Sequence, residues 1–152
     1  MRRPLSNLIS LLIAFAALAP ISSHAEPAAA DCCADGCELL IAYVPIAKAL
    51  AADDLKTVQT SSAALVKQAD ADGMDGIVTK ARAVGAATNL ADARSAFKIL
   101  SEEIKPLAND AKGYSIVTCP MAKADWVQRT GTVENPYYGK SMLTCGTVKK
   151  AN

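Results

Sequence analysis

Residues 37–52, with the sequence CELLIAYVPIAKALAA, carry the pattern that decides how the folded part of this chain begins. Apolar side chains recur there at the three- and four-residue spacing of one helix face. They are Leu40, Ile41, Val44, Ala47 and Leu50. Pro45 has no backbone N–H, so we expect it to kink this helix or to shift its start. The stretch therefore predicts a helix with one apolar face.

A second helix is predicted directly after the first. Asp53 or Asp54 is placed to cap its N-terminus, and apolar residues at helical spacing continue towards Asp70. Residues 70–76, DADGMDG, are polar and contain two glycines, which permit a sharp reversal of the backbone. We expect a turn between two helices there.

Two further helical segments complete the pattern. The first covers residues 77–87, and the second opens at Asn89 or Asp92 and breaks near Pro106, because proline cannot continue a helix. No long strand pattern interrupts residues 38–110. A bundle of about four antiparallel helices with short connections is the most economical arrangement of these segments.

The sequence changes in character after Gly113. The segment 114–118, YSIVT, alternates weakly and is β-branched, and glycine and proline then recur up to Gly146. The expected fold class is all-α: a bundle of roughly four antiparallel helices, with a C-terminal loop-rich lobe at residues 114–148 that carries short extended segments.

The first 25 residues are typical of a secretory signal peptide. Arg2 and Arg3 supply the positive start, residues 8–18 the apolar stretch, and Ser-His-Ala at 23–25 a small-residue cleavage site. The apolar run is short for a membrane-spanning helix. We therefore expect cleavage after residue 25 and a periplasmic or secreted protein.

The mature chain then has about 127 residues, the size of one domain. It divides into a flexible cysteine-containing leader at 26–36 and a single helical domain at 37–150. Removing Arg2 and Arg3 from the 16 basic residues leaves 14 against 15 acidic ones. A net charge near −1 without a long basic run argues against a nucleic-acid partner.

The sequence gives no support for an enzyme. Its one histidine, His24, falls within the signal peptide, so the mature chain has no imidazole. No nucleophile lies beside an evident base. We expect a binding protein instead.

Two sulfur motifs in the C-terminal lobe contain the candidate metal-binding residues. They are Cys119-Pro-Met121 and Met142-Leu-Thr-Cys145. Cysteine and methionine sulfurs without histidine form a donor set that soft monovalent metals prefer, above all Cu(I). Zn(II) favours more thiolate, histidine or carboxylate than this set offers. We expect Cys119, Met121, Met142 and Cys145 to bind Cu(I) or a similar soft ion.

The lobe also carries a family resemblance. The residues that show it are, in order, Tyr114, Cys119-Pro120-Met121-Ala122, Trp126, Asn135-Pro136-Tyr137-Tyr138-Gly139, Met142-Leu143 and Cys145-Gly146. This order resembles a bacterial domain family of unknown function, found in stand-alone exported proteins and fused to the adaptor subunits of copper and silver efflux systems. The resemblance extends upstream over most of the mature chain. It implies a helical periplasmic domain whose metal ligands are Cys119, Met121, Met142 and Cys145, with an efflux adaptor or a metal carrier as partner.

A disulfide is the competing interpretation of the same cysteines. A bond between Cys119 and Cys145 would close a loop of 26 residues and contribute roughly 3 kcal/mol in the loop-entropy model. The protein would then be a metal-free interaction module of the cell envelope, stapled by that bond. A disulfide alone does not explain a methionine beside each cysteine.

A separate cysteine cluster lies in the leader. Cys32, Cys33 and Cys37 make the total cysteine count of five odd, so not all can pair within the chain. A disulfide from Cys32 or Cys33 to Cys37 and a second soft-metal site are both compatible with this spacing. The spacing is not the Cys-x-x-Cys of thioredoxin-like proteins.

Overall fold

The computed structural model of this chain describes residues 37–151. The predicted signal peptide and leader, with Cys32 and Cys33, lie outside these residues and stay predictions. Within the described part of the chain, no helix is both long enough and apolar enough to cross a membrane.

Four α-helices occupy the first two thirds of the described chain, as predicted. They are α1 (Cys37–Ala51), α2 (Leu55–Ala71), α3 (Asp75–Gly85) and α4 (Leu90–Ile104), and the short 3₁₀ helix η1 (Lys105–Ala108) follows α4. Helix α1 starts at Cys37 and continues through Pro45, so the proline does not shift its start. Helix α3 begins two residues earlier than the sequence pattern suggested.

The helix starts show which predicted caps are used. The carboxylate of Asp54 accepts the Thr57 backbone N–H at 3.0 Å and so caps α2. Asn89 caps α4, because its side-chain oxygen accepts the Asp92 N–H at 2.9 Å. Each of these bonds satisfies a backbone donor that the first helical turn leaves without an intrahelical partner.

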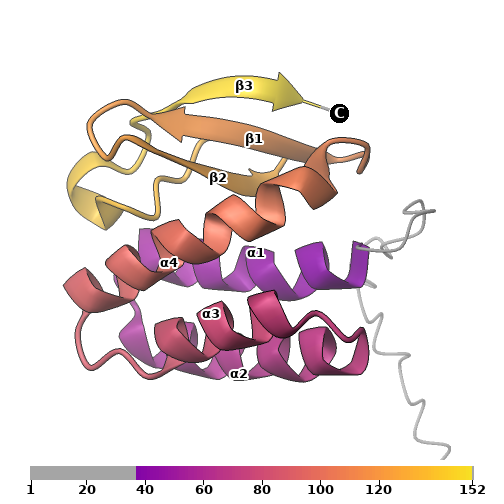
Figure 1. Cartoon of the computed structure of the whole chain (residues 1–152). Helices are drawn as coiled ribbons and strands as arrows, with labels where there is room; N and C mark the ends of the chain where they lie inside the picture. The colour runs from indigo at the N-terminus through magenta and orange to yellow at the C-terminus, as the bar shows by residue number, and fades with distance from the viewer. Residues whose placement is uncertain (1–36, 152) are drawn as a thin grey trace, which may run out of the picture. The chain divides into compact units, whose positions relative to one another are not determined.

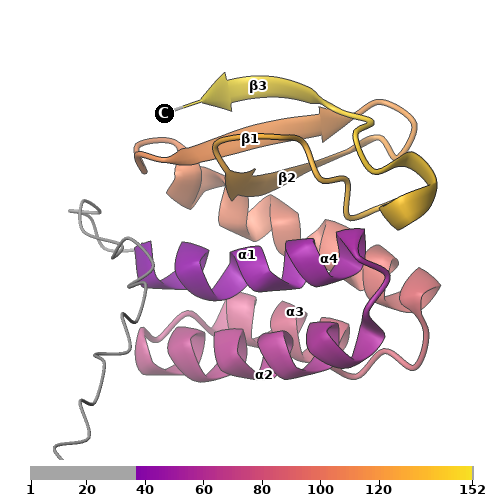
Figure 2. The same ribbon diagram turned by 180° about the vertical axis from the view of Figure 1, so that it is seen from behind.

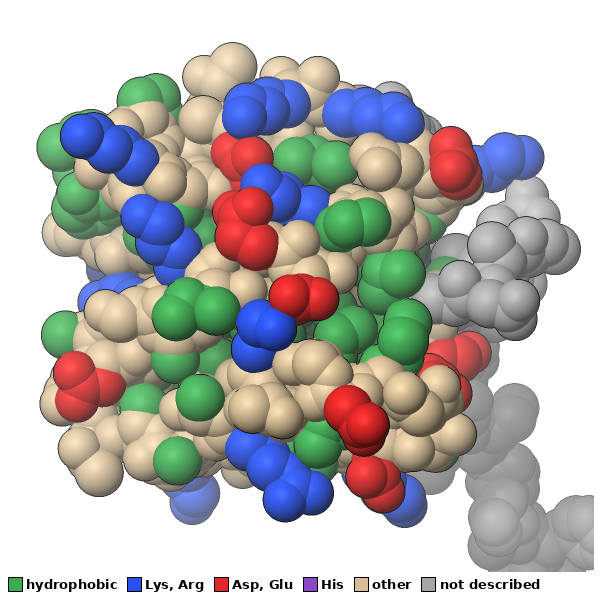
Figure 3. Space-filling view, in the orientation of Figure 1, with side chains coloured by type: hydrophobic (Ala, Val, Ile, Leu, Met, Phe, Trp, Pro, Cys, Tyr) green, Lys and Arg blue, Asp and Glu red, His purple; other side chains and the backbone are tan. Residues whose placement is uncertain are grey.

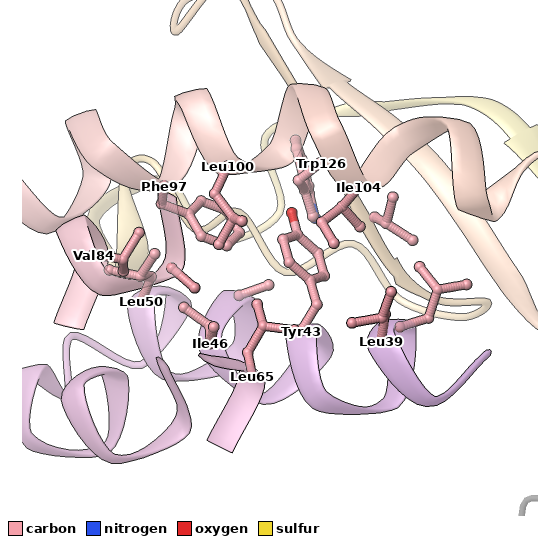
Figure 4. Close-up of a cluster of buried hydrophobic side chains, with 14 of the residues drawn as sticks. Leu39, Tyr43, Ile46, Leu50, Leu65, Val84, Phe97, Leu100, Ile104 and Trp126 are labelled. Atoms are coloured by element: carbon pink, nitrogen blue, oxygen red, sulfur yellow. The ribbon is translucent and has the colours of Figure 1, made fainter. Parts of the chain in front are cut away.

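Consecutive helices pack against each other, and α1 and α4 lie between the sheet and the pair α2 and α3 (Figures 1 and 2). Their apolar faces form one core, in which Tyr43, Ile46 and Leu50 of α1 meet Phe97 and Leu100 of α4 (Figure 4). These five side chains are fully buried. Of the five residues predicted for the apolar face of α1, Leu40, Ala47 and Leu50 are buried, whereas Ile41 and Val44 are only half-buried.

The all-α fold class is wrong, because the C-terminal lobe is a three-stranded antiparallel sheet. Its strands are β1 (Tyr114–Cys119), β2 (Ala124–Arg129) and β3 (Thr147–Ala151), in the order β2-β1-β3. The described part of the chain is a mixed α and β structure, and β1, β2 and the start of β3 lie in the segment 114–148 that is predicted to be loop-rich.

The physical reason for this error lies in the strand sequences. Strand β2 reads ADWVQR and is buried on both sides at Trp126 and Val127, so it lacks a clean alternation of polar and apolar residues. Strand β3 reads TVKKA and is exposed along residues 147–150. Its ladder to β1 depends on pairing with a strand that is distant in sequence, which local periodicity does not report.

Strand β2 contacts α1 and α4, while β3 forms the far edge of the sheet (Figure 1). Lysine and arginine side chains lie over that edge (Figure 3). Lys149 and Lys150 of β3 are both exposed. Lysines on an edge strand discourage pairing with other chains, so this charge has a structural use.

Asp125 on β2 joins the sheet to the end of α4. It accepts hydrogen bonds from the Thr118 hydroxyl, from Lys105 Nζ at 2.9 Å and from Lys149 Nζ at 3.1 Å. Burial alone would raise the pKa of Asp125, but these hydrogen bonds outweigh it and lower the pKa to about 2. The folded state therefore favours the ionised carboxylate.

This pKa predicts acid sensitivity. The folded pKa lies below the unfolded one, so the stabilisation is complete above about pH 4 and is lost as the pH falls towards 2. Across that range we expect Asp125 to account for about 2 kcal/mol of unfolding free energy. Urea unfolding of the wild type and of Asp125→Asn between pH 2 and pH 6 measures this contribution to the unfolding free energy. Asp110→Asn, at an exposed position, is the control. Parallel pH curves for wild type and Asp125→Asn would contradict the assignment.

Candidate functional site: a cysteine pair at the end of the sheet

Cys119 is the last residue of β1 and is completely buried. The chain reverses through residues 120–123 into β2, and within this turn the Ala122 backbone N–H points to Cys119 Sγ at 3.4 Å. Lys98 of α4 holds the turn from outside, because its Nζ donates to the Ala122 carbonyl at 2.9 Å. The Cys119 sulfur thus has a fixed place in the turn, with a backbone N–H directed at it.

Cys145 lies two residues before β3 and is half-buried. Because Thr118 pairs with Thr147, the end of β1 and the approach to β3 are neighbours. Both cysteines are free, and they lie near each other at the end of the sheet. Burial and the nearby Cys119 thiol raise the pKa of Cys145. The structure therefore brings two free thiols close together from positions 26 residues apart in sequence.

Asn135 fixes the loop that carries Cys145. It is fully buried, and its Nδ2 donates to the Cys145 carbonyl at 2.5 Å. Its Oδ1 accepts the backbone N–H groups of Tyr137 at 2.8 Å and Tyr138 at 3.2 Å. Its own backbone N–H donates to the Leu143 carbonyl at 2.6 Å. One amide side chain thus ties together both ends of the segment between residues 135 and 145.

Gly146 allows this segment to lie close to the sheet. A Cβ atom at this position would come within 2.7 Å of the Trp126 ring and 3.0 Å of Val117. Trp126 and Val117 are directly paired across β1 and β2 and share a face of the sheet with Cys119. A side chain at residue 146 would push the loop outwards and move Cys145 away from Cys119.

Arg94 of α4 anchors the same loop to the helices. Its Nε donates to the Pro136 carbonyl at 2.9 Å, and its Nη2 donates to the Leu50 carbonyl at 3.1 Å and to Asp53 Oδ1 at 2.5 Å. Asp53 in turn accepts the Lys140 backbone N–H at 3.2 Å. The Arg94 and Asp53 side chains are 21% and 30% exposed, so this ion pair is partly shielded from solvent.

Replacing Arg94 by alanine is expected to lower the unfolding free energy by about 2–3 kcal/mol, because hydrogen bonds from a charged donor are lost. Arg94→Lys keeps the charge but not the fork of donors, and we expect it to recover only part of the loss. Urea denaturation measures both variants. A loss below about 0.5 kcal/mol for Arg94→Ala would show that the anchor is not needed.

The aromatic side chain of Tyr137 in the loop packs among buried rings. The Tyr137 ring packs edge-on against Trp126, with centroids 5.9 Å apart, and tilted against Phe97 at the same separation. Its hydroxyl donates to the Asp125 carbonyl at 2.5 Å. Tyr43 stacks on Phe97 at 5.2 Å. This row of rings joins the sheet to α1 and α4 beneath the cysteine pair.

The two methionines of the predicted site lie beside the cysteines in sequence. Met121 is in the turn after β1, and its side chain is 58% exposed. Met142 is half-buried at the end of the short 3₁₀ helix η2 (Gly139–Met142), and its carbonyl accepts the Cys145 N–H at 3.0 Å. Within residues 37–151, neither methionine sulfur takes part in a hydrogen bond.

Of the second predicted cluster, only Cys37 belongs to the described residues. Cys32 and Cys33 lie outside them. Cys37 is buried at the start of α1 and is disulfide-bonded, and its partner is neither Cys119 nor Cys145, since both of these are free. A metal site at Cys32, Cys33 and Cys37 stays a prediction.

No three His, Cys, Asp or Glu side chains of the described chain come together as a metal-binding group. The cysteine pair therefore offers two thiols, with thioethers as the nearest further sulfur donors in sequence. Such a set suits a soft ion that accepts low coordination numbers, rather than a harder cation that needs several oxygen or nitrogen ligands.

These features define a small four-helix domain with an appended three-stranded sheet and a dithiol at the sheet end. Residues 39–115 match the model of a family described as a protein of unknown function (DUF3347). The chain belongs to this family. The match covers the helices and ends at the start of β1, so the sulfur motifs lie outside the matched residues. No curated protein and no solved structure matches the chain.

The sequence interpretation missed the positioning role of three polar residues. Asn135, Arg94 and Asp53 fix the loop of Cys145 through contacts that span 10 to 87 residues. The Asn-Pro dipeptide at 135–136 marked a turn, but it did not show that the amide binds the cysteine backbone.

Proposed function

We propose that this protein is an exported soft-metal-binding protein that takes up Cu(I), or a similar ion such as Ag(I), at Cys119 and Cys145. Met121 and Met142 serve as further ligands. The protein acts in periplasmic metal handling as a carrier, buffer or efflux accessory, and it is not an enzyme. The observation that carries this proposal is the closeness of the two free thiols at the end of the sheet.

The donor chemistry supports a soft ion. Thiolates and thioethers prefer Cu(I) over harder cations. The Ala122 N–H directed at Cys119 Sγ holds that sulfur in place at the end of β1. Binding also removes the repulsion between two adjacent thiolates, because the cation lies between them.

The setting supports an exported protein with a partner in the envelope. Residues 1–25 carry the signal-peptide pattern, and the C-terminal motif resembles domains fused to adaptor subunits of copper and silver efflux systems. An efflux adaptor or a metal carrier is therefore the proposed partner. Half-buried Cys145 and exposed Met121 leave the ion accessible for transfer to it.

Anaerobic titration of the reduced protein with Cu(I) against a chromophoric Cu(I) chelator tests the proposal. We expect the protein to withdraw about one equivalent of Cu(I) at the cysteine pair from the chelator, and to compete far less well for Zn(II) against a zinc chelator. Equal competition for both ions, or none for Cu(I), would contradict it.

The methionines give a finer prediction. Met121→Leu and Met142→Leu conserve side-chain volume while removing the thioether, so the fold should be kept. Each is expected to weaken Cu(I) binding by about tenfold, less than the loss of a cysteine. Met74→Leu is the matched control. Met74 is the N-cap residue of α3, outside the C-terminal lobe, and is 38% exposed. Chelator competition measures all three variants, and an unchanged affinity in both Met121→Leu and Met142→Leu would remove the thioethers from the site.

A metal-free module closed by a Cys119–Cys145 disulfide is the second candidate, favoured by the same closeness of the two cysteines. The two candidates differ in redox state. Thiol counting on protein taken from the cell under alkylation distinguishes the two candidates. A fully oxidised Cys119–Cys145 pair supports the disulfide-linked module, and a reduced or metal-protected pair supports the metal site.

A further inference from the structure

The two thiols of the pair differ in accessibility. Cys119 is completely buried at the end of β1, whereas Cys145 is half-buried in the loop before β3. A reagent from solution therefore reaches the Cys145 sulfur first. The Cys119 sulfur is shielded from solution, and the pairing of Thr118 with Thr147 brings the chain at Cys145 close to it.

The backbone around the pair is suited to a covalent link. Neighbouring residues on antiparallel strands have Cα atoms about 4.5–5.5 Å apart, which is within the range that disulfides span. Thr118 and Thr147 are such neighbours, and each cysteine lies one or two residues beyond them. Cys145 is outside regular secondary structure, so small backbone shifts there do not break the sheet ladder.

We propose that Cys145 and Cys119 form an ordered thiol–disulfide exchange site for low-molecular-weight disulfides, in which Cys145 reacts first and Cys119 closes the intramolecular bond. This site differs from a permanent staple because it is reversible and has a defined order of attack. It is also separate from the Cys32, Cys33 and Cys37 cluster.

The exchange balances in two steps. Cys145 gives its proton to water and attacks one sulfur of the small disulfide, whose S–S bond breaks and releases one thiolate that takes up a proton. Cys119 then gives up its proton and attacks the Cys145 sulfur of the mixed disulfide, which releases the second small thiol. Two protein thiols are oxidised to one disulfide, and the small disulfide is reduced to two thiols.

One consequence rests on the proposed function. Oxidation removes both thiolate ligands, so the exchange would release a bound soft ion and reduction would restore the site. The exchange itself needs no metal and is tested on metal-free protein. Failure of the exchange therefore leaves the Cu(I) titration unaffected, and failure of Cu(I) binding leaves the exchange test unaffected.

Glutathione disulfide is the probe, added to the reduced, metal-free full chain in the presence of a chelator. Trypsin cleaves after Lys112, Lys123, Lys140 and Lys149, so Cys119 and Cys145 fall on different peptides and are followed separately by mass spectrometry. In the wild type we expect the end product to be the two peptides joined by a disulfide. Dithiothreitol should separate them again.

The order of attack is tested by single replacements and by alkylation. Cys119→Ser should accumulate glutathione on Cys145, because no second thiol resolves the mixed disulfide. In Cys145→Ser, glutathione disulfide should modify Cys119 slowly. We expect the Cys119 thiol to be lost at least about tenfold more slowly in this variant than in the wild type. In the unmutated protein, brief treatment with iodoacetamide should label Cys145 at least about tenfold faster than Cys119, which keeps the test valid if a variant unfolds. Equal labelling of the two cysteines, or mixed disulfide found first on Cys119, would overturn the proposal.

Discussion

Replacing both Cys119 and Cys145 by serine is expected to abolish competition of this protein for Cu(I). Serine removes the soft sulfur donors but keeps a side chain of similar size, so the sheet end should still fold. Loss of groups that merely support a metal ligand costs about 10–100-fold in affinity, and loss of both thiolates should cost more. The measurement is chelator competition with reduced protein under anaerobic conditions.

The matched control for this variant is Cys32→Ser with Cys33→Ser, which removes the same number of thiols from the leader. If the sheet-end pair is the main site, the control binds Cu(I) with nearly wild-type affinity there. Tight binding that survives in the Cys119 and Cys145 double variant but disappears in the control would move the site to the leader. Circular dichroism of both variants verifies that the fold is intact.

Asn135→Ala is expected to have the largest effect on stability of the changes near the site. It leaves the N–H groups of Tyr137 and Tyr138 and the carbonyl of Cys145 without their partner in a buried place. Each unsatisfied buried group costs about 1–3 kcal/mol, so the unfolding free energy should fall by about 3–5 kcal/mol. Because Cys145 is no longer held, Cu(I) affinity should fall as well.

Asn135→Asp separates these two effects. Aspartate retains an oxygen acceptor for the two tyrosine N–H groups but cannot donate to the Cys145 carbonyl when ionised. Urea denaturation and Cu(I) competition on both variants measure stability and affinity independently. A variant Asn135→Ala that unfolds like the wild type would show that water replaces the amide and that the loop is held elsewhere.

The helical half of the fold could be predicted from the sequence because its signals are local. Apolar residues at helical spacing, Asp54 and Asn89 at the caps and the polar turn near Gly73 all act within a few residues of one another. The sheet could not, because β1 and β3 are joined by pairing across about 30 residues and β3 has exposed lysines in place of an apolar face. Its stability comes from β1 and not from its own composition.

In the candidate site, too, local sequence signals could be interpreted, whereas contacts between residues distant in sequence could not. Residue type alone pointed to Cys119 and Cys145, and the structure brings these two free cysteines close together at the end of the sheet. The residues that hold them there were not predictable in this role, since Asn135, Arg94 and Gly146 act through contacts that exist only once the loop lies against the helices and the sheet. The assignment of Met121 and Met142 as ligands stays a prediction.

The separation of β1 and β3 in sequence has a consequence for biosynthesis. The helices contact their neighbours in sequence, so they can assemble early, whereas the ladder between β1 and β3 must wait for residues 147–151. Cys119 is synthesised 26 residues before Cys145, so during translation its thiol is without this neighbour while the helices and the β1–β2 hairpin can already form.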